Sequence, residues 1–282
     1  MEIIRTVKGL AETADAMRRA GKSIGLVPTM GALHAGHKSL VDRARRENDV
    51  VIVSVFVNPT QFNNPDDLRT YPRTEEADCA LLEACGVDYA FVPTPAEVYP
   101  EPDTRGFELG PVAEVMEGAM RPGHFNGVAQ IVSKLFAWAM PTRAYFGEKD
   151  FQQIAVIRRM VELEGFDLEI VPCPIVREDD GLALSSRNVR LSAEARSIAP
   201  QIHRILADSV DLKAQGYEAE EVERMVTDAI NNIDGLEAEY YQIVDARTMQ
   251  PVKKWAEAGD LGAAGCVTVY CGGVRLIDNI RY

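Results

Sequence analysis

The chain has 282 residues, more than one small core requires, and fits one large α/β domain or two domains. Its share of 46% hydrophobic and 26% charged residues is ordinary for a soluble globular protein. With 30 basic and 43 acidic side chains the net charge is −13, which argues against nonspecific binding to nucleic acid or to a membrane surface.

The N-terminal residues, the apolar stretches and the cysteines of the sequence indicate a cytoplasmic protein. Residues 1–5 have no basic start followed by an apolar core, so no signal peptide is expected. The longest apolar stretch, Val50 to Val57, is far shorter than a membrane span. The five cysteines form no CxxC pair, and we expect buried thiols in a reducing compartment instead of disulfides or zinc ligands.

Strands alternate with helices over the first 170-odd residues, which predicts a doubly wound parallel sheet. A first amphipathic helix carries Leu10, Ala14 and Met17 and ends at Gly21. The expected strands cover residues 24–27, 49–57, 88–92, 144–146 and 168–171. The expected helices cover residues 74–85, 112–120, 128–140 and 151–164, with one more after residue 37. Residues 93–102 are rich in proline and should form an extended loop, and residues 121–127 a donor-rich turn.

The composition changes after Pro174, where a smaller α+β domain is expected to begin. Helices should start at Ser192, with a kink near Pro200, and cover residues 217–232. Strands are expected at residues 237–245, 266–271 and 274–280. We therefore expect two domains, residues 1–174 and 175–282.

The stretch PTMGALHAGHKS, residues 28–39, joins a predicted strand to a predicted helix. Ligands of α/β proteins gather at such junctions, and the N–H groups of a helix N-terminus favour phosphate. Gly31 and Gly36 have no Cβ and let a ligand approach the main chain. His34 and His37 can donate ring N–H bonds to phosphate oxygens. The alternative is that both histidines only cap the helix.

Three further polar loops are expected at the same edge as residues 28–37: residues 58–62, 147–150 and 184–188. Together these loops offer imidazoles, a lysine, an arginine, hydroxyls and amides, which suits a triphosphate and an oxygen-rich small substrate. The sequence places no histidine–acid pair beside Ser185 and Ser186, so a serine hydrolase is not expected. No GxGxxG or GxxxxGK[ST] motif is present, so neither dinucleotide nor P-loop chemistry is indicated.

The segments PTMGALHAGHKSL, FVNPTQF, FGEKDFQQ and LALSSRN resemble, in order and spacing, the motifs of the pantoate–β-alanine ligase family, the pantothenate synthetases. The HxGH and SSRN elements are also similar to the HIGH and KMSKS elements of class I aminoacyl-tRNA synthetases. Arg187 stands where those synthetases carry a lysine-bearing signature, and it offers a planar fork instead of a mobile point charge.

The resemblance implies an ATP-dependent ligase with a pantoyl-adenylate intermediate. The carboxylate of (R)-pantoate would attack the α-phosphate of ATP and release pyrophosphate; the amine of β-alanine would then displace AMP to give pantothenate. It also implies a Rossmann-like ATP- and pantoate-binding domain at residues 1–174, a lid domain at 175–282 that carries the SSRN loop, and a homodimer. Mg2+ should enter on the triphosphate with few protein ligands, and no metal-ligating residue, nucleic-acid partner or membrane partner is expected.

The site residues follow from the same resemblance. Those implied to act in catalysis are His34, His37 (as proton donor), Lys149, Ser185, Ser186 and Arg187. Those implied to contact ATP are Met30, Gly31, Ala32, Leu33, His34, Ala35, Gly36, His37, Gly147, Glu148, Lys149, Asp150, Val176, Leu184, Ser185, Ser186 and Arg187. Those implied to hold pantoate are Gln61, also near β-alanine, and Gln153.

Other interpretations stay open for several of these residues. Asp150 is also a good helix N-cap, Gln153 also fits a solvated helix surface, and residues 185–187 also fit an interdomain linker. Weaker candidates near pantoate or phosphate are Asn58, Tyr71 and Arg121, and those expected to be structural are His124 and His203. The rival functions are another nucleotidyl-transferring enzyme of the same superfamily and a nucleotide sensor without turnover. A tRNA synthetase is disfavoured by the acidic charge.

Overall fold

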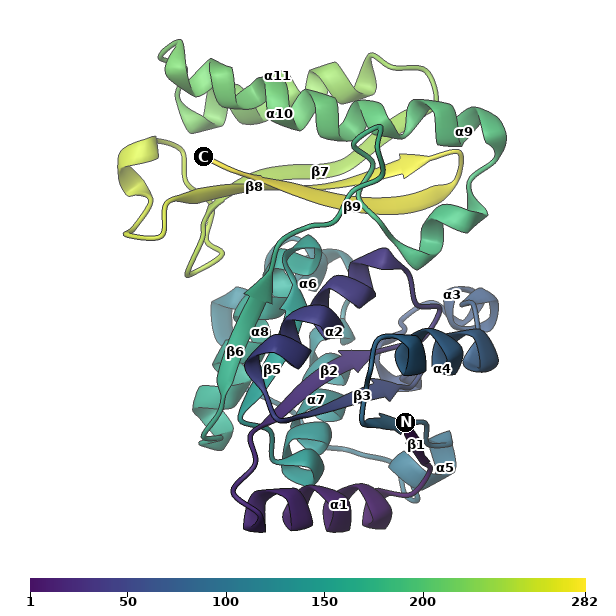
Figure 1. The fold of residues 1–282 in the computed structure, drawn as a ribbon. Helices are drawn as coiled ribbons and strands as arrows, with labels where there is room; N and C mark the ends of the chain where they lie inside the picture. Colours follow the sequence, from purple (N-terminus) through teal and green to yellow (C-terminus); the bar gives the residue numbers. More distant parts are fainter. The chain divides into compact units, whose positions relative to one another are not determined.

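The computed structural model describes residues 1–282, which form two compact units (Figure 1). The first unit comprises Met1–Leu109, Arg121–Glu148 and Val156–Pro174. The second unit comprises Gly110–Met120, Lys149–Ala155 and Ile175–Tyr282. None of the helices combines the length and the apolar character that a membrane crossing needs.

The first unit is a parallel sheet with helices on both faces, so the predicted fold class is confirmed. Its six strands lie in the order β1-β4-β3-β2-β5-β6. The strands are β1 (Glu2–Ile4), β2 (Ile24–Thr29), β3 (Val50–Val55), β4 (Tyr89–Phe91), β5 (Arg143–Gly147) and β6 (Glu169–Cys173). The helices are α1 (Val7–Arg19), α2 (Ala35–Glu47), α3 (Pro65–Thr70), α4 (Glu75–Ala84), α5 (Pro95–Val98), α7 (His124–Ala139) and most of α8 (Phe151–Glu164).

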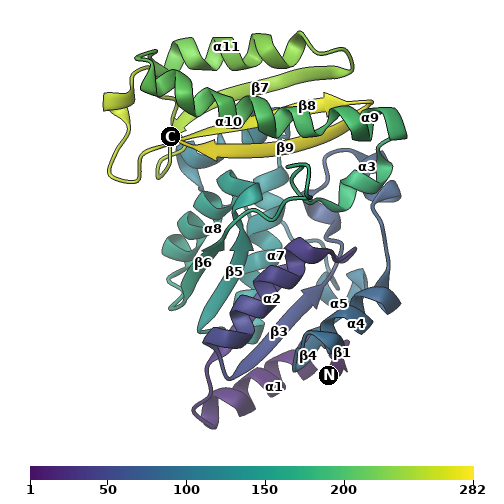
Figure 2. The same cartoon turned by 45° about the horizontal axis from the view of Figure 1, so that its top comes forward.

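The β-branched run of β3 is buried along its whole length, as a central strand covered on both faces must be. Alternate side chains point to opposite faces. Val27, Val51 and Val53 pack into one apolar cluster with residues of α2 and α4. The intervening Ile24 and Leu26 are fully buried on the other face, where α1 and α7 contact β2 (Figures 1 and 2). Helices on both faces leave the carboxyl ends of the strands as the open edge.

The second unit contains the three strands that the sequence predicts, and they form a small antiparallel sheet in the order β7-β8-β9. Its strands are β7 (Leu236–Asp245), β8 (Ala263–Cys271) and β9 (Val274–Arg281). Its helices are α6 (Glu117–Met120), α9 (Ala193–Ile198), α10 (Pro200–Ala214) and α11 (Ala219–Asn231). Ile202 and Leu206 of α10 and Val222 and Val226 of α11 pack on one face of this sheet.

The opposite face of the small sheet is covered by the two segments that the unit takes from earlier in the chain. Met116 and Phe151 pack there against Ala264 and Cys266. Arg275 of β9 donates two hydrogen bonds to the Glu117 carboxylate, at 2.6 and 2.8 Å. The pair joins residues 158 positions apart, which a sequence pattern does not reveal.

Three predictions of local structure were wrong, and in each case the backbone conformation of one or two residues explains the difference. Residues 93–102 contain α5, because Pro95 stands at a first-turn position that needs no N–H and the Thr94 hydroxyl caps the helix. The helix expected over residues 112–120 is broken at Met116, whose φ is +48°. Helix α7 begins at His124, inside the expected turn, because Gly123 adopts φ +83° as its N-cap.

One buried carboxylate in the first unit is held by two cations. The side chain of Asp103 is 6% exposed, and its carboxylate lies 3.1 Å from Arg105 Nη2 and 3.1 Å from Lys134 Nζ on α7. Burial by itself would raise the pKa of Asp103, but the hydrogen bonds from Arg105 and Lys134 outweigh it and lower the pKa from 3.8 to about 2. The ionised form is therefore favoured in the folded state.

We expect this carboxylate to make the stability of the protein depend on acid pH. A lowered folded-state pKa gives stabilisation that is complete above pH 4 and is lost as the pH falls toward 2, by about 2 kcal/mol. Chemical denaturation of the wild type and of Asp103→Asn at pH 5 and pH 2 measures it. The difference between the two unfolding free energies should shrink at pH 2, and a constant difference would contradict the assignment.

Candidate active site

The loop from β2 into α2 ends in a mutual cap formed by its two histidines. His34 is the N-cap of α2, and its Nδ1 accepts a hydrogen bond from the Gly36 N–H at 3.1 Å. The Nδ1 of His37 accepts from the His34 N–H at 3.3 Å. The ring centroids lie 4.1 Å apart. The sequence pattern of a capping box is thus filled here by imidazoles instead of hydroxyl and carboxylate groups.

This cap decides which ring nitrogen carries the proton. A main-chain N–H can only donate, so both Nδ1 atoms are acceptors and, in the neutral rings, both protons are assigned to Nε2. Each imidazole then has one nitrogen committed to the helix and one N–H donor on its other side. Capping and ligand binding, which the sequence leaves as alternatives, are therefore compatible in His34 and His37.

A buried carboxylate on α4 fixes the loop between β2 and α2 through hydrogen bonds. Asp78 is 2% exposed, and it accepts hydrogen bonds from the Ala32 N–H at 2.9 Å and the Leu33 N–H at 2.8 Å. The Thr74 hydroxyl donates to the same carboxylate at 3.1 Å. Gly31 has φ +78°, and a Cβ on it would lie 2.9 Å from Asp78 Oδ2. The approach of Asp78 therefore requires glycine at position 31.

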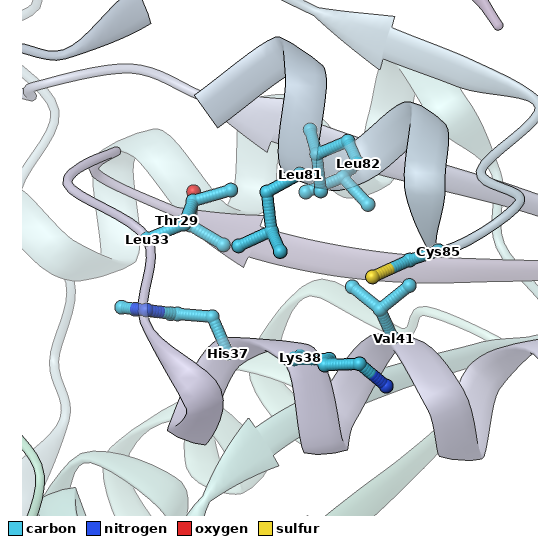
Figure 3. A pocket seen from close by; sticks show the side chains of 9 residues that line it. Thr29, Leu33, His37, Lys38, Val41, Leu81, Leu82 and Cys85 are labelled. Atoms are coloured by element: carbon cyan, nitrogen blue, oxygen red, sulfur yellow. The ribbon is translucent and has the colours of Figure 1, made fainter. Parts of the chain in front are cut away.

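Apolar packing closes the space between this loop, α2 and α4. Figure 3 shows the side chains of α2 facing those of α4 across a narrow gap beneath the loop. Those that line the gap include Thr29, Leu33, His37, Lys38, Val41, Leu81, Leu82 and Cys85. The gap is too small to hold a water molecule. Helix α2, which carries His37, therefore packs against α4 through a contact without water.

Gln61 lies beside the histidine loop, in the short helical turn η1 (Pro59–Gln61) that follows β3. Its Nε2 is 3.2 Å from the Met30 sulfur. Its Oε1 accepts a hydrogen bond from Asn58 Nδ2 at 3.1 Å, and the same Nδ2 donates to the Gly127 carbonyl at 3.0 Å. A carbonyl can only accept, so the Asn58 amide has one orientation and Gln61 must turn its NH2 group away from it.

The main chain at Gln61 is fixed from α7. His124 Nδ1 donates to the Gln61 carbonyl at 2.8 Å, and Arg121 Nη1 lies 3.4 Å from His124 Nε2. A Cβ at Gly127 would lie 2.3 Å from the Thr60 carbonyl oxygen, so only glycine permits this close approach. His124 thus links α7 to the main chain of Gln61, and Arg121 contacts its ring. Tyr71 is 6% exposed and packs edge-on against Phe62, with ring centroids 5.7 Å apart.

The predicted segment 147–150 is divided between the units. Gly147 ends β5 and Glu148 follows it, both in the first unit, where β5 is the neighbour of β2. Lys149 and Asp150 belong to the second unit and form an ion pair, with 3.1 Å between Nζ and Oδ2. Gln153 is half-buried. The preceding residue, Gln152, is buried, and its side-chain NH2 group donates hydrogen bonds to the Val112 and Val115 carbonyls.

The remaining predicted residues form a hairpin and a short turn of helix in the second unit. Val176 and Leu184 pair through a hydrogen bond from the Leu184 N–H to the Val176 carbonyl, at 3.0 Å. The Ser185 hydroxyl caps the following turn, η4 (Ser186–Arg190), by accepting from the Arg187 N–H at 3.2 Å. His203 Nδ1, on α10, lies 3.9 Å from an Asp278 carboxylate oxygen.

The first unit brings Met30–His37 together with Gln61 at one sheet edge, and the second unit carries Lys149, Asp150, Gln153, Val176 and Leu184–Arg187. Sequence reasoning missed Asp78, which looks like one of several acids in the first turns of α4, and it undervalued Asn58. A buried acid gives no local signal when its partners lie 45 and 46 residues away. No group of three or more His, Cys, Asp or Glu side chains is arranged to hold a metal ion.

Comparison with known proteins gives close relatives along the whole chain. A family model described as pantoate-beta-alanine ligase matches residues 2–281. A pantothenate synthetase from Bacteroides fragilis (strain YCH46) is 59% identical over 282 residues, covering 100% of this chain and 99% of the relative. One from Thermus thermophilus is 48% identical over 279 residues, covering 99% of each chain.

Solved structures agree with these relatives. A crystal structure of pantothenate synthetase from Thermus thermophilus superposes with a TM-score of 0.92 at 46% identity, covering 100% of this chain and 99% of that one. A pantoate-beta-alanine ligase from Francisella tularensis, complexed with beta-gamma ATP and beta-alanine, has a TM-score of 0.79 at 35% identity, covering 100% and 97%. The chain therefore belongs to the pantoate–β-alanine ligase family.

Proposed function

We propose that this protein uses ATP to join (R)-pantoate to β-alanine through a pantoyl adenylate, releasing pyrophosphate and AMP. Family membership supports the ligase activity, as does the complex of the Francisella tularensis relative with beta-gamma ATP and beta-alanine. The observation that carries the mechanism is the mutual cap of His34 and His37, which sets two Nε2–H donors at the N-terminus of α2.

In the first half-reaction a pantoate carboxylate oxygen attacks the α-phosphorus, and the bond from that phosphorus to the bridging oxygen breaks. Negative charge then grows on the departing pyrophosphate. Neutral imidazole donors and the N-terminus of α2 stabilise this charge, and His37 is the proton donor. Such phosphoryl transfer depends on positioning and charge neutralisation and needs no covalent nucleophile on the protein.

Gln61 and Gln153 are proposed to hold pantoate. The NH2 group of Gln61 suits an oxygen acceptor, either a hydroxyl or a carboxylate of the substrate. The second half-reaction needs the same neighbourhood, because the β-alanine amine must reach the acyl carbon. Its attack forms the amide bond, AMP leaves with the former carboxylate oxygen, and the ammonium loses its proton.

The groups of the second unit are proposed to complete the nucleotide site. Lys149 and Arg187 would add positive charge at the phosphates, Ser185 and Ser186 would add hydroxyl donors, and Asp150 would accept from the ribose. Val176 would meet the adenine through its main chain. A loop closed over the adenylate also protects it from water, which would otherwise hydrolyse this reactive acyl donor.

The wider setting is part of the same proposal. Mg2+ enters as a complex with ATP, since a triphosphate offers the hard oxygen ligands that this ion prefers. The enzyme works in the cytoplasm as a homodimer and requires no nucleic acid or membrane. Its five free cysteines suit a reducing compartment.

Isotope exchange tests the proposal directly. The protein is incubated with ATP, labelled pyrophosphate and (R)-pantoate, without β-alanine, and label should enter ATP only when pantoate is present. Exchange that depends on another acid or on CTP would identify a different nucleotidyltransferase. ATP that stays intact with all three substrates present would identify a sensor.

Removal of the His37 imidazole should lower pantoate-dependent exchange by about 100–1000-fold, the usual loss when one donor to developing charge is removed. His37→Ala also removes the acceptor for the His34 N–H, at a cost of about 1 kcal/mol in stability. His37→Asn is the matched variant, because its amide oxygen can restore the cap. If His37→Asn exchanged at the wild-type rate, the imidazole would have no role beyond capping.

Asp78→Asn should lower exchange by about 10–100-fold while the chain still folds. An amide can satisfy only one of the two loop N–H donors and turns its own NH2 toward the other, which displaces the loop that carries the histidines. Thr74→Val is the control, since it removes a hydrogen bond to the same carboxylate without touching the loop. Equal losses in the two variants, measured with matched melting curves, would show a purely structural effect.

A further inference from the structure

The hairpin that precedes the Ser185–Arg187 loop is fastened to β9 by one aspartate. Arg177 donates to both carboxylate oxygens of Asp278, at 2.6 and 2.9 Å. The Asp278 side chain is 5% exposed, and its Oδ1 also accepts from the Asn279 N–H at 2.7 Å. A buried bidentate arginine–carboxylate pair is geometrically specific, so this contact defines where the hairpin lies on the strand.

The hairpin itself is tightly bonded, so its anchor also fixes the loop that follows. The Glu178 N–H donates to the Leu182 carbonyl at 2.8 Å, and Arg177 pairs with Ala183 in an antiparallel bridge. Arg177 Nη1 also donates to the Gly181 carbonyl at 3.2 Å. In both views the hairpin before α9 lies beside β9 (Figures 1 and 2). Leu184 is the last paired residue, and the Ser185–Arg187 loop follows directly.

The next residue of the strand fastens the lysine segment. Asn279 Nδ2 donates to the Lys149 carbonyl at 3.1 Å, across 130 residues of sequence. Asn279 is 6% exposed. Successive strand residues point to opposite faces, so Asp278 reaches the hairpin on one face of β9 and Asn279 reaches Lys149 on the other. Both contacts lie within the second unit.

We propose that Asp278 and Asn279 are positioning residues that set the spacing between Lys149 and the Ser185–Arg187 loop, and thereby the fit of the second unit to the triphosphate of ATP. This inference rests on the proposed function, in which both segments contact the nucleotide. Each residue acts through the segment that it holds. A shift of about 1 Å in either anchor would misplace a cation or a hydroxyl at the phosphates, which is enough for a loss of about 10–100-fold.

Substitutions of the same size test the two anchors separately. Asn279→Asp replaces the NH2 donor by an oxygen that faces the Lys149 carbonyl. Asp278→Asn keeps the shape but loses the charge that pairs with Arg177. Asp245→Asn is the matched control, because Asp245 is a buried aspartate of the same unit that holds the turn at residues 247–259 through main-chain N–H groups.

The measurements are the KM for ATP, the KM for pantoate and kcat of pyrophosphate exchange, with melting temperatures for all variants. We expect Asn279→Asp and Asp278→Asn to raise the KM for ATP or lower kcat by about 10-fold or more, with the KM for pantoate unchanged. Asp245→Asn should lower the melting temperature without this effect. Kinetic losses that only follow the melting temperature across all three variants would overturn the proposal.

A double-mutant cycle separates positioning from general damage. In protein that already carries Lys149→Ala, the further change Asn279→Asp should alter the KM for ATP and kcat only a little, because Asn279 acts by positioning Lys149. Full additivity of the two changes would overturn the role of Asn279. Wild-type protein without pantoate-dependent exchange would instead reject the proposed function, so the two failures are distinguishable.

Discussion

Two main-chain N–H groups at the start of α2 donate to the Nδ1 atoms of His34 and His37, and the proposed chemistry of the site depends on this arrangement. It holds the rings in one tautomer, with their centroids 4.1 Å apart. A carboxylate there would favour imidazolium but would also repel a triphosphate. Because the backbone orients the rings, the proposed anion site needs no carboxylate to fix their tautomer, which suits an enzyme with a net charge of −13.

The cost of this geometry lies in the loop before it. Ala32 has φ +50°, a left-handed conformation that costs an ordinary residue roughly 1–2 kcal/mol. The hydrogen bonds from Ala32 and Leu33 to Asp78 offset this cost, since bonds to a buried charged group contribute about 1.5–3 kcal/mol each. The strained backbone at Ala32 and the Asp78 carboxylate that stabilises it therefore lie next to each other in the structure but 46 residues apart in the sequence.

Much of this protein follows from local pattern, and the limits of that pattern are physical. The run from Val50 to Val55 predicts a central strand because a chain buried on both faces must be apolar throughout. The junction at residues 28–39 predicts a ligand site because strand ends and helix starts leave N–H groups unpaired. Asp78, Asp278 and Asn279 are invisible to such reasoning, because their partners lie 45 to 130 residues away. Met116 breaks a helix at a backbone angle that apolar spacing does not encode.

The amide of Asn58 has a consequence for which molecules can approach Gln61. Its NH2 group faces the Gly127 carbonyl, a main-chain acceptor that no side-chain replacement can invert. The polarity passes through Asn58 to Gln61, whose own NH2 group faces Met30. An ammonium group at this end of Gln61 would face the NH2 group, and two donors cannot hydrogen-bond to each other. An oxygen atom at the same place would accept a hydrogen bond from the NH2 group. For a zwitterion such as an amino acid, a single backbone carbonyl would thus favour the carboxylate end over the ammonium end at Gln61.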